Sequence, residues 1–192
     1  MSNIDRTALL SMDYQNGIVA SIPASASAIE RTAEAIAVVR ELGGHVGHVR
    51  VAFRDEDIAA MPESSAMAAM ITPERRAAMH ADAEGTAFDE RVAPQDGDIV
   101  VRKTRVGAFS TTDLAERLRE REVDTLVLTG IATSGVVLST LRDAADRDFR
   151  LIVLADACAD HDQEVHDLLT GRVFARQAKV LRSGELRAEL GG

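Results

Sequence analysis

Cysteine, tryptophan and long apolar runs are scarce or absent in this chain of 192 residues. It contains one cysteine, Cys158, and no tryptophan. A single cysteine excludes an intrachain disulfide and any metal site built from several thiolates. No apolar run reaches the roughly 20 residues that a membrane-spanning helix needs, and the first residues lack the pattern of a cleaved signal peptide. We therefore expect a cytoplasmic protein with no membrane association.

Basic residues are outnumbered, and lysine is the rarer of the two types. The chain has 22 basic residues against 31 acidic ones, a formal net charge of −9 at pH 7. Such a charge disfavours nucleic acids and anionic membranes, so the expected partner is a small molecule. Only Lys103 and Lys179 are lysines. Because lysine offers a compact ammonium whose pKa can be tuned, each of them is a candidate for function.

Apolar runs of strand length alternate with stretches of helical spacing. The expected strands are 7–13, 45–53, 98–103, 125–130, 150–157 and 178–183. The expected helices are 25–44, 110–123, 133–148 and 162–178. This alternation predicts one domain, 1–192, of the α/β class, with a parallel sheet covered by helices on both faces. Residues 54–97, with three prolines, predict a loop-rich insertion with one helix near 74–82.

Ligands of open parallel sheets bind at the carboxyl ends of the strands, which selects a few residues. Asp13, Arg54, Lys103, the turn 131–136 and Asp156 all follow or end an expected strand. Asp13 and Lys103 would emerge on the same edge, where the ammonium would lower the pKa of the carboxyl group. Such a pair suits general acid–base chemistry.

Other reactive side chains predict structural roles. Cys158 in "LADACAD" has no basic neighbour that would favour the thiolate, so we expect a small buried residue. The five histidines show no paired metal spacing, and His48 is expected to point from its strand into a helix interface. The segment "TGIATSG" lacks the glycine spacing of a phosphate-binding loop. We therefore expect neither a metal nor a cofactor.

Three separated motifs resemble the isochorismatase-like (cysteine hydrolase) superfamily. They are "LLSMDYQNG", "VVRKTRVGAFSTTDL" and "TGIATSGVVLSTLRDA", in that order, and the likeness extends through "RLIVLADACAD". The resemblance implies a Rossmann-like, three-layer α/β/α sandwich with a six-stranded parallel sheet. It also implies a homodimer or a larger homo-oligomer.

Most members of this superfamily use an Asp–Lys–Cys triad, and the resemblance places two of its residues here. Asp13 and Lys103 match, whereas the cysteine position falls on Val136, which cannot form a thioester. The segment "FRDEDIAAM" lacks the histidine of the metal motif found in nicotinamidases. Isochorismatases likewise keep the Asp and Lys without the thiol, and cleave a vinyl ether. By that resemblance Asp13 is the general acid, and Lys103 positions it and binds negative charge.

The turn between strand and helix has further implied roles. By resemblance, Ile131–Ala132 is a cis peptide bond and the backbone N–H of Val136 contributes to an oxyanion hole. Thr133 or Ser134 is expected to cap the following helix, whose N-terminus would favour an anion. Ser134 as a replacement nucleophile is the alternative. The expected lining of the pocket adds Tyr14, Phe109 and Arg54, with Arg105 as a further basic residue.

Two functional hypotheses follow. The first is a metal-free hydrolase of a small anionic molecule that acts through Asp13 and Lys103 without a covalent intermediate. The second is a non-catalytic relative that keeps the pocket as a ligand-binding or oligomeric module.

Overall fold

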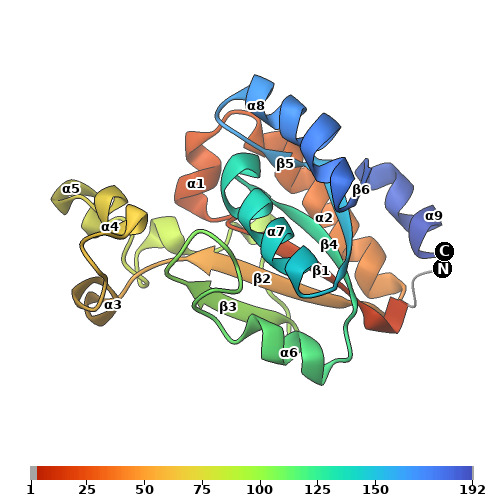
Figure 1. Cartoon of the computed structure of the whole chain (residues 1–192), viewed down its shortest axis with the longest axis horizontal. Helices are drawn as coiled ribbons and strands as arrows, with labels where there is room; N and C mark the ends of the chain where they lie inside the picture. The colour runs from red at the N-terminus through yellow and green to blue at the C-terminus, as the bar shows by residue number, and fades with distance from the viewer. Residues whose placement is uncertain (1–3, 192) are drawn as a thin grey trace.

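The computed structural model describes residues 4–191, and its centre is one parallel sheet between two layers of helices (Figure 1). The strands are β1 (Thr7–Met12), β2 (His45–Val51), β3 (Ile99–Lys103), β4 (Thr125–Ile131), β5 (Arg150–Ala159) and β6 (Lys179–Leu181). They lie in the order β3-β2-β1-β4-β5-β6, and every neighbouring pair is parallel. The expected α/β class and six-stranded parallel sheet are therefore confirmed.

Two apolar clusters hold the helices against the faces of the sheet. One face packs against α1 (Asn16–Ser21), α2 (Ser25–Glu41) and α9 (Leu186–Leu190). The other face packs against α6 (Leu114–Glu120), α7 (Leu138–Asp146) and α8 (Gln163–Leu168). All seven residues of β4 are buried, as expected for a central strand covered on both sides.

The helices are shorter than the sequence pattern predicts. A π-helical turn, η4 (Thr133–Val137), precedes α7, and a second one, η5 (Leu169–Val173), interrupts the last predicted helix at Gly171. Residues 110–113 stay outside α6, because the Thr112 hydroxyl bonds the backbone locally and Asp113 is the N-cap residue. The remaining short 3-10 helices are η1 (Ile4–Arg6), η2 (Glu84–Thr86), η3 (Glu90–Val92), η6 (Phe174–Arg176) and η7 (Ser183–Glu185).

The insertion between β2 and β3 is loop-rich, as expected, but the prediction of one helix near 74–82 is wrong. Three short helices occur instead: α3 (Asp55–Ala59), α4 (Ala66–Met70) and α5 (Pro73–Arg76). Figure 1 shows them on the left of the view, set apart from the sheet. Across residues 4–191, no helix has both the length and the apolar character to cross a membrane.

The register of the central strands brings the candidate site together. Val51 pairs with Lys103, and Met12 pairs with Gly130. The backbone N–H of Asp13 extends the β1–β2 ladder with a hydrogen bond of 2.8 Å to the Val49 carbonyl. The ends of β1, β3 and β4 therefore meet at one edge.

Candidate active site

Asp13 stands at the point where β1 turns away from the sheet. Its φ of 61° lies in the left-handed region, which Asp and Asn adopt more readily than most side chains. Its carbonyl accepts from the N–H of Gln15 at 2.8 Å, which closes a tight turn. The residue is only 5% exposed. The strand and the turn thus hold a carboxyl group inside the protein.

Lys103, the last residue of β3, is the partner of that carboxyl group. Its Nζ lies 2.8 Å from Oδ2 of Asp13. The ammonium also donates to the carbonyls of Arg105 and Val106, at 3.2 and 2.9 Å. Three acceptors match the three hydrogens of an ammonium, so its position is fixed.

The pKa of Asp13 is raised, because burial penalises the carboxylate more than Lys103 stabilises it. The sequence-based expectation that Lys103 lowers this pKa is therefore wrong in its net direction. Oδ1 of Asp13 is buried and has no hydrogen-bond partner among residues 4–191. One carboxyl oxygen is held by the ammonium, and the other has no partner among the described residues.

The turn after β4 has the backbone that the resemblance implies. The Ile131–Ala132 peptide bond is cis. A side chain at Gly130 would come within 2.8 Å of the Met12 carbonyl, so the close approach of β1 and β4 requires glycine there. Val136 follows in η4, is 2% exposed, and belongs to the apolar cluster that contains Met12.

Neither Thr133 nor Ser134 caps the helix through its side chain, which corrects the expectation. The cap is Asp160, whose Oδ2 accepts from the backbone N–H of Ser134 at 2.7 Å. Burial raises the pKa of Asp160, but the N–H of Ser134 and other donors outweigh this, so the pKa is lowered. The anion at this N-terminus is thus the protein's own carboxylate. The hydroxyl of Thr133 instead lies 2.8 Å from Nδ1 of His166.

The sequence analysis did not predict a role at this turn for Asp160 or His166. Asp160 follows a strand end and was open to the same argument as Asp13. The spacing of His166 along the chain gives no sign of its contact with Thr133 of the turn.

Tyr14 and Phe109 contact core residues. The Tyr14 hydroxyl donates to the Ala157 carbonyl at 2.5 Å and accepts from Thr32 on α2 at 2.8 Å. Phe109 stacks on Phe149, just before β5, with a centroid distance of 6.1 Å. Because β5 begins at Arg150, this places Phe109 toward the amino end of the sheet.

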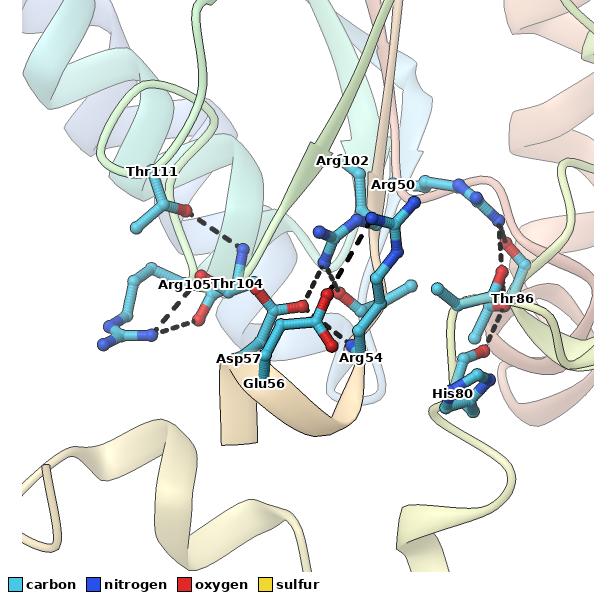
Figure 2. Close-up of polar contacts among 12 residues, drawn as sticks. Arg50, Arg54, Glu56, Asp57, His80, Thr86, Arg102, Thr104, Arg105 and Thr111 are labelled. Carbon is cyan, nitrogen blue, oxygen red and sulfur yellow. Dashed lines mark hydrogen bonds and ion pairs between the residues drawn. The ribbon is translucent and has the colours of Figure 1, made fainter. Parts of the chain in front are cut away.

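Arginines gather at the carboxyl ends of β2 and β3 (Figure 2). Arg54 precedes α3 and its side chain is 60% exposed. Arg105 donates to the carbonyl of Thr104 at 2.7 Å. Arg50 and Arg102 join them, and the sequence analysis had counted both only as strand residues.

Cys158 and His48 occupy the expected structural positions. Cys158 is buried, and burial raises the pKa of its thiol to about 12. His48 is buried, and its Nε2 lies 3.0 Å from Asp98, which also pairs with Arg40 of α2. Within the part of the chain that the structure describes, no three His, Cys, Asp or Glu residues group as metal ligands.

The fold and the buried pair define a class: a three-layer α/β/α protein with a candidate acid–base site at the carboxyl edge of its sheet. The chain belongs to the isochorismatase family, because a model described as "Isochorismatase domain" matches residues 7–185. It is 34% identical over 179 residues to the uncharacterized isochorismatase family protein YwoC of Bacillus subtilis. The aligned region covers 92% of this chain and 91% of YwoC.

Named enzymes are among the other similar proteins. The chain is 30% identical over 171 residues to maleamate amidohydrolase of Pseudomonas putida, covering 84% of this chain and 76% of the enzyme. It is 36% identical over 172 residues to ureidoacrylate amidohydrolase RutB of Methylorubrum extorquens, covering 80% and 69%. A solved isochorismatase family protein from Burkholderia thailandensis superposes with a TM-score of 0.85, 29% identity, and coverage of 98% and 97%.

Proposed function

We propose that the chain is a hydrolase of a small anionic metabolite, with Asp13 as the general acid–base residue and Lys103 as its partner. The observation that carries the proposal is the buried pair itself. Its raised Asp13 pKa favours a protonated carboxyl group that can donate, and Oδ1 has no partner within the protein. Neither feature requires a thiol at residue 136.

Hydrolysis of a vinyl ether, such as that of isochorismate, is the most concrete reaction. The Asp13 carboxyl group transfers its proton to the terminal carbon of the vinyl group, which leaves an oxocarbenium ion. Water attacks this ion, loses a proton, and forms a hemiketal that separates into a ketone and an alcohol. The Asp13 carboxylate left by the first step is stabilised by the Lys103 ammonium, 2.8 Å away.

The first test is pyruvate release from isochorismate by the purified protein. We expect release that disappears in Asp13→Ala and persists in Glu120→Gln, a change to an exposed acidic residue of α6. Absence of release would exclude isochorismate as the substrate. Absence of turnover with maleamate and ureidoacrylate as well would favour the second hypothesis, a ligand-binding relative without catalysis.

The names of the relatives support a test with amides. Restoring the family thiol in Val136→Cys should create amidase activity toward maleamate or ureidoacrylate if Asp13 and Lys103 keep their functional arrangement. Val136→Ser controls for the smaller side chain. A Val136→Cys protein that folds yet is inert toward these amides would argue that the pocket no longer accepts them.

A further inference from the structure

Three arginines meet at the carboxyl ends of two neighbouring strands. Arg50 and Arg102 are register partners on β2 and β3, and Arg54 follows β2 directly before α3. Figure 2 shows their guanidinium groups on the same edge, between the start of α3 and Thr86. Arg102 directly precedes Lys103 in β3, so their side chains leave opposite faces of the strand, and the arginine cluster shares the carboxyl edge of the sheet with the Asp13–Lys103 pair.

Arg50 is held in place by groups that leave its charge uncompensated. One of its terminal nitrogens donates to the carbonyls of Ala81 and Thr86, at 3.2 and 3.1 Å. Its guanidinium carbon lies 5.9 Å from the centre of the Phe88 ring. Among residues 4–191 no carboxylate lies within ion-pair distance of Arg50. Its pKa is lowered, first by burial and then by the charge of Arg102, against a smaller opposing effect of Asp82.

The other two arginines differ in how far they are paired. Arg102 donates to the Ala52 carbonyl at 2.9 Å and to Asp57 at 2.6 Å, so its charge has a close counter-ion. Arg54 lies 3.9 Å from Glu56, and both side chains are mostly exposed, at 60% and 72%. Ion pairs of this exposed kind contribute little. Among the described residues, Arg50 therefore has no carboxylate counter-ion, and Arg54 has only a weak, exposed one.

We propose that Arg50 and Arg54 bind an oxyanion, a carboxylate or phosphate group of the substrate, with Arg102 held beside them by Asp57. Guanidinium groups match these anions with paired N–H donors. The carboxyl edge of a parallel sheet is also where ligands of such folds bind. The proposal rests on the proposed function only in making this anion part of the substrate.

The test is isothermal titration with succinate, inorganic phosphate and neutral succinamide at one fixed ionic strength. We expect saturable binding of at least one of the two anions and none of succinamide. Arg54→Gln should weaken that binding about tenfold or more. The change should leave the fold intact, because the backbone N–H of Arg54 keeps its bond to Asp57 and its side chain has only the exposed 3.9 Å contact with Glu56. Arg50→Lys keeps the positive charge but removes the paired N–H donors of the guanidinium group, so it should also weaken anion binding.

The matched control is Arg31→Gln, which removes an exposed arginine of α2 that is paired with Glu34. It should leave anion binding unchanged. Tighter binding of phosphate than of succinate would assign a phosphorylated substrate, and the reverse a carboxylate. Equal affinities in the wild type and Arg54→Gln, or no saturable binding of either anion, would overturn the proposal.

The same titration separates this proposal from the proposed function. Asp13→Asn should lose turnover while keeping anion binding. Turnover that did not depend on Asp13 would end the proposed function and leave the titration result standing. Unchanged binding in Arg54→Gln beside an Asp13-dependent reaction would end only the anion site.

Discussion

Asp13 joins two properties that favour a chemical role over a structural one. Its left-handed backbone conformation turns the chain at the strand end, and its carboxyl group is buried against a single cation. A turn residue placed only for its conformation would expose its carboxyl group to water. Burying the Asp13 carboxylate beside Lys103 costs free energy and raises its pKa, and such perturbed groups are common at proton-transfer sites.

Asp13→Asn should abolish turnover while preserving the fold. Asparagine adopts the left-handed region about as readily as aspartate, and its amide oxygen can still accept from Lys103. Loss of general acid–base catalysis should lower kcat by about 100-fold or more. Steady-state kinetics with circular dichroism provide the measurement, and an Asn variant with wild-type kcat would contradict the assignment.

Lys103→Met should destabilise the protein in a pH-dependent way. Removing the cation leaves the Asp13 carboxyl group buried alone, so its pKa rises further. A raised pKa in the folded state gives stability that is complete below the unfolded value of 3.8 and is lost as pH rises through the folded pKa. The deficit against the wild type should therefore widen from acid to neutral pH, to about 3 kcal/mol or more.

Chemical denaturation across pH measures this deficit. Lys179→Met is the matched control, because the only other lysine forms an exposed pair with Glu189. It should change stability little and show no such dependence on pH. A Lys103→Met deficit that stayed constant with pH would contradict the prediction.

At the scale of elements, the strand-to-helix turn depends on a residue outside it. Asp160, which directly follows β5, accepts from the N–H of Ser134 and so fixes the first turn before α7. The next strand in the sheet thereby holds the turn that contains Val136. The carboxylate also neutralises the helix N-terminus, which leaves binding of a substrate anion to other groups.

Asp160→Ala should cost about 1 kcal/mol of folding free energy at neutral pH, the typical effect of losing a cap. Because the pKa of Asp160 is lowered in the folded state, its contribution is present above 3.8 and is lost as pH falls through the folded pKa. The difference from the wild type should shrink in acid. Asp162→Ala, which removes the cap of α8, should spare turnover where Asp160→Ala lowers it. Equal effects of both variants on turnover would contradict this assignment.

The elements show where sequence reasoning succeeds and where it fails. Apolar runs predicted all six strands, most clearly β1 and β4, whose residues are all buried and leave a continuous apolar run. The edge strand β6 has no buried residue and left only a short run. The last helix was overestimated, because π-helical turns keep the helical spacing of apolar residues while changing the backbone. The insertion was misjudged near Pro73, since three short helices leave too few turns to show a period.

At the scale of the whole molecule, His48 links the sheet to the helical layer. Its ring bonds Asp98, which also receives Arg40 of α2, and packs edge-on against Phe88. The prediction that His48 points from its strand toward a helix is thus confirmed, since Asp98 links it to Arg40 of α2. The contact with Asp98 depends on how the chain returns after the insertion, which the sequence does not show.

His48 should make the protein less stable in mild acid. Burial lowers its pKa below 6.5, against the opposing effect of Asp98. As pH falls below about 6.5, the unfolded chain binds a proton that the folded protein excludes, so the free energy of unfolding decreases. The slope is at most about 1.4 kcal/mol per pH unit for one proton. Urea titrations of wild type and His48→Gln should diverge in slope there, and parallel curves would contradict the prediction.

The sequence predicted the main residues of the candidate site but not the direction of the Asp13 pKa shift. Asp13 and Lys103 were found from strand ends and the scarcity of lysine. The direction of the Asp13 pKa shift could not be predicted, because it depends on how deeply the carboxyl group is buried, which only the packed structure determines. Arg50 and Arg102 were not predicted as site residues, because they become neighbours only through the register of β2 against β3.

The burial of the one thiol makes this chain a convenient scaffold for site-specific labelling. Cys158 is inaccessible, and its pKa of about 12 leaves almost no thiolate at neutral pH. A single cysteine introduced at an exposed position, such as in the helices of the insertion, would then be the one site that a maleimide dye or spin label modifies in the native protein. The natural thiol need not be removed first.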